Sequence, residues 1–456
     1  MLTSPVHEEF SSSASLDINS TTLEVGEVCV SVDMEVETNI YNGHTSFSSS
    51  TKPHATSSDP CWNAMQRIKS EVSSLSLDDF YFIQKLGSGD IGSVYLVELK
   101  ENINKGCLFA AKVMDKEELV SRSKEGRART EMEILEMLDH PFLPTLYTTL
   151  GTDKWSLLLT EFCPGGDLHV LRQRLPEKRF DEAAVRFYTS EVVVALEYLH
   201  MMGIIYRDLK PENVLVRSDG HIMLTDFDLS LKCDDSIVMP QLVHDEGTSP
   251  KMNDQFSHLS SPYNSSYSSC ILPNCIVPHV SCLYPKHRQR KRRGGSRAER
   301  PLKLVAEPIE ARSMSFVGTH EYLAPEIVSG EGHGNAVDWW TLGIFMYELL
   351  YGATPFREDN EFTLSNIVAR AFEFPKEPMV STMAKDLITQ LLIKEPTMRM
   401  GSMMGATTIK QHPFFDGVNW ALLRCTTPPH IPQNFNSTRD FVSSYDGDDD
   451  DYLDYY

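Results

Sequence analysis

The chain has 456 residues, 23% of them charged and 41% hydrophobic, with a formal net charge of -22 and a mean hydropathy of -0.27. This length fits one two-lobed domain with tails, or two domains, and the negative charge argues against general nucleic-acid binding. The start, MLTSPVHEEF, lacks the features of a signal peptide, no apolar run is long enough to span a bilayer, and nine cysteines without a CxxC pair indicate a reducing, cytoplasmic setting.

Residues 1–76 are rich in Ser and Thr and lack periodic apolar positions, so we expect a disordered arm. Order begins near Phe80, where YFIQKLGSGDIGSVYLVEL shows strand-like alternation on both sides of a glycine turn. A further strand, LFAAKVM, and a helix in RARTEMEILEMLDH follow. We assign 77–162 to a small β-rich lobe.

The rest of the chain is mainly helical. Asp181 can cap a helix in DEAAVRFYTSEVVVALEYLH, a second helix ends at Gly352, and a third, VSTMAKDLITQLLI, ends before Pro396. These helices form a larger lobe over 163–415, and the order of elements predicts an α+β, two-lobed fold. A Ser-, Pro- and Asn-rich insert at about 233–312 interrupts the pattern, and an interruption this long is functional or disordered.

The first motif with chemical meaning is the glycine-rich turn of the small lobe. Glycines let backbone amides approach phosphate oxygens closely. A GxGxxG pattern alone is weak, but a dinucleotide-binding fold would need a helix next, and here a strand follows. The expected nucleotide-contacting residues are Leu86, Gly87, Ser88, Gly89, Asp90, Ile91, Gly92, Ser93 and Val94.

Lys112 ends the strand after this hairpin. A lone lysine is more often a solvated charge, but an ammonium steadied by a carboxylate can hold the α- and β-phosphates. Glu131 in the following helix is the expected partner; Glu133 and Glu136 are the alternatives, since helix surfaces routinely carry such acids.

The run YRDLKPEN places three functional groups at fixed intervals. Asp208 can orient a hydroxyl and accept its proton, and Lys210 can neutralise the moving phosphoryl group. Asn213 can ligate Mg²⁺, as can Asp226 after the strand-like HIMLT. Glu326 and Arg399 are expected to form a buried ion pair; otherwise they are unrelated surface charges.

In this order the motifs resemble the eukaryotic protein kinase superfamily over about 80–415. The runs YRDLKPEN, CPGGDLH and SFVGTHEYLAPE are similar to those of the AGC group. DFD at 226–228, the long insert and CILPNCIVPHVSC resemble the plant AGC kinases (class VIII), which include PINOID and related auxin-transport-regulating kinases.

The resemblance implies an ATP- and Mg²⁺-dependent serine/threonine kinase with Asp208 as catalytic base. It makes Thr160 the gatekeeper beside a hinge that includes Glu161 and Cys163, and it directs Asp167 to the ribose. It makes Ser315 an activation-loop phosphosite that pairs with Arg207 when phosphorylated. The residues expected to read basic positions in substrates are Glu212 and Glu348.

Two features, Asp228 and the C-terminal tail, leave alternatives open. Asp228 stands where kinases usually have glycine, which reduces backbone freedom and adds charge beside the metal ligand. A weakly active or pseudokinase-like membrane scaffold is therefore the alternative function. The tail 416–456 ends in Tyr452–Tyr456, either a docking motif for its own small lobe or for a phosphoinositide-dependent upstream kinase, or a frayed acidic end.

The basic run 286–303 is a solvated loop, a nuclear localisation signal or an anionic-lipid contact. The related kinases associate with the plasma membrane, which favours the lipid contact. We expect a monomeric cytoplasmic protein peripherally bound to the plasma membrane, with a nuclear fraction if the run is a nuclear signal. By resemblance, auxin-efflux carriers are its expected substrates.

Overall fold

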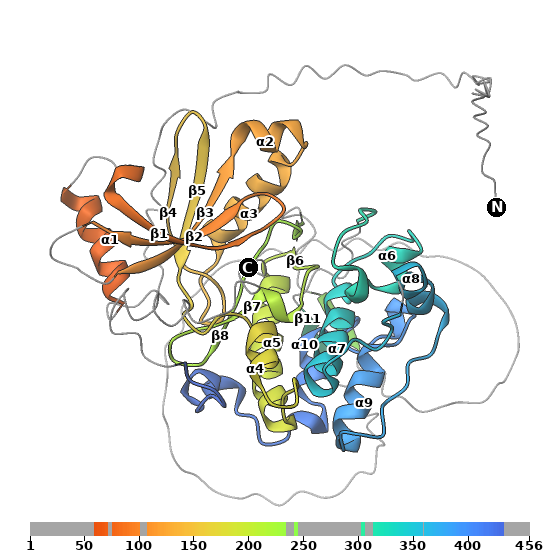
Figure 1. The fold of residues 1–456 in the computed structure, drawn as a ribbon. Helices are drawn as coiled ribbons and strands as arrows, with labels where there is room; N and C mark the ends of the chain where they lie inside the picture. The colour runs from red at the N-terminus through yellow and green to blue at the C-terminus, as the bar shows by residue number, and fades with distance from the viewer. Residues whose placement is uncertain are drawn as a thin grey trace, which may run out of the picture. The chain divides into compact units, whose positions relative to one another are not determined.

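The computed structural model describes residues 59–71, 75–100, 107–233, 241–244, 302–305, 313–358 and 360–432. The tail beyond 432, most of the insert and most of residues 1–76 lie outside these ranges, so the expectations for them stay predictions. The described residues form a small sheet-containing lobe and a larger helical lobe (Figure 1), as the pattern of elements predicts.

The small lobe contains a five-stranded antiparallel sheet with the order β1-β2-β3-β5-β4. Its strands are β1 (Phe80–Ser88), β2 (Ser93–Leu99), β3 (Leu108–Asp115), β4 (Leu146–Gly151) and β5 (Trp155–Glu161). The β1–β2 hairpin contains the glycine-rich turn. In the register of the sheet, Lys112 lies between Val94 and Leu158, so its position in the middle of the sheet is fixed.

One prediction for the small lobe is wrong. Residues 60–71, expected within a disordered arm, form α1 (Pro60–Glu71), whose residues Ala64 and Met65 are buried against Phe109 of the sheet. Asp59 caps this helix by accepting the backbone N–H groups of Cys61 and Trp62. The other helical elements of the lobe are a 3-10 turn (Leu77–Asp79), α2 (Lys116–Ser121) and α3 (Glu125–Met137).

The larger lobe is built on helices. They are α4 (Leu168–Arg174), α5 (Glu182–Met201), α6 (Pro325–Val328), α7 (Ala336–Tyr351), α8 (Asn360–Ala369), α9 (Thr382–Leu391) and α10 (Ala406–Lys410). Short 3-10 turns lie at Pro211–Asn213, His320–Tyr322, Pro396–Met398, Pro413–Phe415 and Trp420–Cys425. No helix in the described ranges is both long and apolar enough to cross a membrane.

The predicted helix ends are confirmed where the capping residue is explicit. Asp181 accepts the N–H of Ala184 at 2.8 Å and starts α5. Gly352 follows α7 with a φ of 81°, the left-handed conformation that glycine adopts without steric cost. The predicted Glu326–Arg399 ion pair is also confirmed, with Nη1–Oε1 at 2.7 Å.

Short strand pairs complete the lobe. β6 (Ile204–Ile205) pairs with β9 (Leu231–Lys232), and β7 (Val214–Val216) pairs with β8 (Ile222–Leu224). Inside the insert, β10 (Gln241–His244) pairs with β11 (Leu302–Val305) in antiparallel register. The insert, which shows no sustained periodicity in the sequence, thus contains a two-stranded ladder.

Candidate active site

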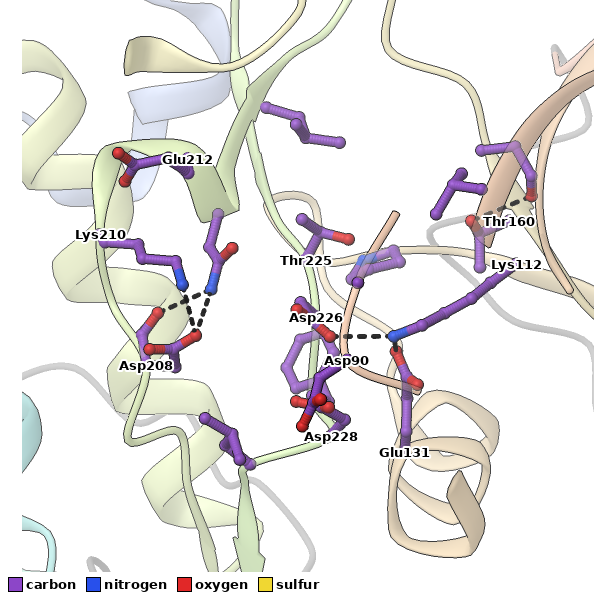
Figure 2. Close-up of a pocket in the computed structure, with 18 of the residues that line it drawn as sticks. Asp90, Lys112, Glu131, Thr160, Asp208, Lys210, Glu212, Thr225, Asp226 and Asp228 are labelled. Atoms are coloured by element: carbon purple, nitrogen blue, oxygen red, sulfur yellow. Dashed lines mark hydrogen bonds and ion pairs between the residues drawn. The ribbon is translucent and has the colours of Figure 1, made fainter. Parts of the chain in front are cut away.

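A cavity of about 770 Å³ lies between the two lobes and brings the predicted motifs together (Figure 2). Its walls come from the glycine-rich turn, β3, α3, the segment after β5, and residues of the larger lobe. The larger-lobe residues fall in three stretches, 208–215, 223–229 and 316–320. Sequence positions more than 200 residues apart therefore share one cleft.

Lys112 makes two ion pairs, one with Glu131 inside the small lobe and one with Asp226 across the cleft. Its Nζ lies 2.8 Å from Glu131 Oε1 and 2.9 Å from Asp226 Oδ1. Burial lowers the pKa of Lys112, but Asp226 and Glu131 together outweigh that effect and raise it, so the ammonium stays charged. The predicted pairing with Glu131 is thus confirmed, while Glu133, one of the two alternatives, lies 3.5 Å from Lys232.

Asp208 is almost fully buried and is held by three side chains. Lys210 Nζ donates to Oδ2 at 3.0 Å, the Asn213 amide donates to the same oxygen at 2.9 Å, and Thr319 Oγ1 donates to Oδ1 at 3.1 Å. Burial raises the pKa of the Asp208 carboxyl. The carboxylate is therefore fixed in orientation and is a better proton acceptor than a solvated aspartate.

Asp226 occupies an unusual backbone conformation next to this group. It is one of four non-glycine residues with positive φ in the described ranges, at 60°, while Asp228 is not among them. The following side chain, Phe227, is fully buried, and it packs on Tyr206 with ring centroids 5.4 Å apart. The glycine-to-aspartate departure at 228 therefore adds charge without forcing a left-handed backbone at that residue.

The residues fit the Mg²⁺ and ATP that the resemblance implies. Asp226 and Asn213 both line the cavity and supply oxygen ligands, which Mg²⁺ prefers. Lys112 faces them with a paired ammonium, and the glycine-rich turn lies over the same space. These residues would hold a metal–nucleotide complex at its phosphates.

The glycine-rich turn meets the cavity through only some of its predicted residues. Those that line it are Leu86, Ser88, Gly89, Asp90 and Val94. Those that do not are Gly87, Ile91, Gly92 and Ser93. Packing explains why position 92 is a glycine, since a Cβ there would lie 2.5 Å from the Val113 carbonyl oxygen.

The predicted hinge residues line the cavity, whereas Asp167 lies outside its lining. Thr160, Glu161 and Cys163 line the cavity. Asp167 is 1% exposed, is outside the lining, and caps α4 by accepting the Val170 N–H at 2.7 Å. One carboxylate oxygen thus serves as a helix cap, and the contact of Asp167 with the ribose stays a prediction.

The predicted regulatory and substrate-reading residues have different surroundings. Ser315 Oγ accepts from Arg207 Nη1 at 2.7 Å, as expected of a phosphosite beside this arginine. Glu212 lines the cavity and faces His169 at 3.0 Å. Glu348 is buried, 2.8 Å from Arg172 Nη2, and accepts from the Tyr322 hydroxyl, so its carboxylate is already engaged.

Two side chains at the site escaped prediction from the sequence. Thr319 holds Asp208, and its position directly after Gly318 in SFVGTHEY was the available signal. Arg127 lines the cavity from α3 and pairs with both Asp90 and Asp228. In the sequence it is one of several charges on a helix, and no pattern distinguishes it.

Comparison with known proteins agrees with this geometry. The protein kinase domain family model matches residues 80–249 and 304–415. The chain is 51% identical to the serine/threonine-protein kinase KIPK2 of Arabidopsis thaliana over 440 residues, which are 93% of this chain and 44% of that protein.

Two shorter relatives from the same plant align over most of their length. AGC1-7 is 54% identical over 85% of this chain and 69% of its own, and RHS3 is 54% identical over 84% and 74%. Both carry the name serine/threonine-protein kinase. The chain spans less than half of KIPK2. By these matches and its motifs, the chain belongs to the protein kinase family, in its plant AGC-type serine/threonine branch.

Proposed function

We propose that this protein transfers the γ-phosphoryl group of ATP to serine or threonine hydroxyls of other proteins. The observation that carries the proposal is convergence: the Lys112–Glu131–Asp226 ion pairs and the Asp208–Lys210–Asn213 cluster face one cavity. The names of its relatives support the same activity.

Each group has a separate task in this chemistry. ATP with Mg²⁺ would supply the phosphoryl group and neutralise part of its charge. Asp208, held by Thr319 and Asn213, orients the substrate hydroxyl and accepts its proton. Lys210, whose Nζ lies 3.0 Å from Asp208, adds positive charge where negative charge develops. Lys112 positions the phosphates.

The test is transfer of labelled phosphate to a serine-containing protein by wild type, Asp208→Asn and a control, Asp416→Asn, at an exposed position. Loss of a positioned general base costs about 10²–10⁴-fold in rate. Wild type and the control should incorporate label at equal rates, and Asp208→Asn at a rate lower by that factor. Background incorporation by all three proteins would overturn the kinase assignment and favour the scaffold alternative, while equal incorporation above background would overturn the role of Asp208.

We further propose a preference for basic residues before the target hydroxyl. The support is Glu212, which lines the cavity with a side chain 37% exposed. Glu348 has only an indirect part here, since Arg172 and Tyr322 occupy its carboxylate. On an arrayed peptide library, Glu212→Gln should reduce selection for Arg and Lys; unchanged selection would contradict the proposal.

We also propose action at the plasma membrane, in auxin transport or polar growth. Support comes from the resemblance and from the basic run 286–303, where each basic side chain near an anionic surface contributes about 1 kcal/mol. Co-sedimentation with phosphatidylserine vesicles should fall when the Lys and Arg residues of this run are changed to Gln. Unchanged sedimentation would remove the support from this run.

A further inference from the structure

Arg127 lies on α3 and contacts two other parts of the site, the glycine-rich turn and the segment 226–228. Resting on the proposed kinase function, we propose that Arg127 is a positioning residue. It neutralises Asp228 and ties the tip of the glycine-rich turn to the segment that carries the metal ligand Asp226. The pairing gives a physical role to the aspartate that replaces the usual glycine.

The first step of the argument is the spacing on α3. Arg127 and Glu131 are four residues apart and therefore lie one turn apart on one face of the helix. Glu131 reaches Asp226 through Lys112, with N–O distances of 2.8 and 2.9 Å. Arg127 reaches Asp228 directly through Nη2. Two parallel ionic links thus connect α3 to residues 226 and 228, on either side of the buried Phe227.

The second step is charge. Three carboxylates, those of Glu131, Asp226 and Asp228, lie near Lys112. The Asp228 side chain is only 4% exposed, so water screens it poorly, and an unpaired buried carboxylate is costly. Arg127 pairs directly with Asp228 and balances the charge that DFD adds.

The third step is the contact that the other nitrogen of the Arg127 guanidinium makes with Asp90. Arg127 Nη1 lies 2.5 Å from Asp90 Oδ2, at the tip of the glycine-rich turn. Arg122 Nη2, 2.7 Å away, and Lys124 pair with Asp90 Oδ1. Asp90 and Asp228, both labelled in Figure 2, thus share Arg127 as a partner. Through Arg127 the turn above the phosphates and the metal-ligand segment below them are held together.

It follows that the turn, α3 and the metal-ligand segment move as one unit. A metal–nucleotide complex would bind between the two ends of this link. Loss of Arg127 would leave Asp228 without this cation beside Asp226. It would also remove the direct link between the turn and that segment, while Arg122 and Lys124 would still hold Asp90. The dissociation constant of the metal–nucleotide complex and KM for ATP should therefore rise more than kcat falls.

The test is a double-mutant cycle between Arg127 and Asp228. The dissociation constant of a fluorescent ATP analogue is measured with Mg²⁺, together with KM for ATP and kcat. Arg127→Met should weaken binding by roughly tenfold, and because the two side chains are in direct contact the cycle with Asp228→Asn should be non-additive. Arg127→Met/Asp228→Asn should recover most of this loss, because no carboxylate is then left unpaired. Arg127→Lys should lie between, since an ammonium lacks the fork that holds two carboxylates at once.

The controls separate positioning from general damage. Arg129→Met removes an exposed arginine from the same helix and should bind like wild type. All variants should have wild-type circular dichroism. Additive effects of the two substitutions, or wild-type binding by Arg127→Met, would overturn the proposal.

Failure of this proposal is distinguishable from failure of the kinase function. A protein that binds the analogue with a coupled Arg127–Asp228 cycle but transfers no phosphate refutes the kinase activity alone. A protein that transfers phosphate with an additive cycle refutes the role of Arg127 alone.

Discussion

The Arg399–Glu326 ion pair provides the most quantitative prediction, because both side chains are shut off from solvent. Their side chains are 0% and 2% exposed. The guanidinium bonds both carboxylate oxygens, at 2.7 and 2.9 Å, and also the backbone carbonyls of Ala336, Ile393 and Lys394. Arg399→Met therefore leaves one buried charge and three carbonyls without this donor. Removing one partner of such a pair costs about 3–5 kcal/mol, a large part of the 5–15 kcal/mol typical of a folded domain.

The measurement is urea unfolding at neutral pH, followed by fluorescence and circular dichroism. The exposed pair Arg370–Glu358 is the matched control: its N–O distance is 3.4 Å, its side chains are 62% and 51% exposed, and Arg370→Met should cost no more than about 1 kcal/mol. Arg399→Met/Glu326→Gln should recover part of the loss, since no charge then stays unpaired. If Arg399→Met and Arg370→Met shift the midpoint equally, the reasoning from burial is refuted.

Three further predictions concern regulation, pH and the N-terminal helix. A phosphate on Ser315 would make a charge-assisted bond to Arg207, and such bonds contribute about 1.5–3 kcal/mol in total. Phosphatase treatment should therefore slow wild type tenfold or more and leave Ser315→Ala unaffected. An equal effect on both would contradict this site. Burial and then the nearby Arg207 charge lower the pKa of His333 from 6.5 to about 4. Between these values the unfolded chain binds a proton that the folded chain does not, so stability falls as pH decreases, by up to about 3 kcal/mol; urea midpoints from pH 7 to pH 4 should fall less for His333→Gln. Met65 is buried, so Met65→Ala should lower the free energy of unfolding by about 2–5 kcal/mol. Gln66 is exposed, so Gln66→Ala should change it little. Equal effects of the two substitutions would show that α1 is not packed on the sheet.

The parts of the site that could be predicted from the sequence are those formed by short motifs or by neighbouring elements. Asp208, Lys210 and Asn213 lie within six residues of each other, so a local motif largely determines their geometry. Lys112 and Glu131 were paired correctly because the strand and the helix that carry them follow each other in the chain.

Contacts between distant segments could not be predicted in the same way. Arg127 and Asp228 are 101 residues apart, and each side chain alone reads as an ordinary charge. The helix α1 was missed because a short polar sequence gains its stability from Phe109 and other sheet residues, not from its own periodicity. For Asp167 the sequence alone does not decide, since the same carboxylate can cap a helix and face a ribose; here its Oδ1 caps α4.

The β10–β11 ladder has a consequence for how this chain tolerates change. His244 and Leu302 pair directly, so the two ends of the segment 245–301 lie side by side. The kinase family model breaks in this same interval, between 249 and 304. Because the two ends are already together, lengthening, shortening or replacing the intervening residues need not displace the catalytic cleft, and each doubling of length costs only about 0.6 kcal/mol. A fluorescent protein inserted between His244 and Leu302 should leave the kinase activity unchanged. New targeting signals could be added at this position for the same reason.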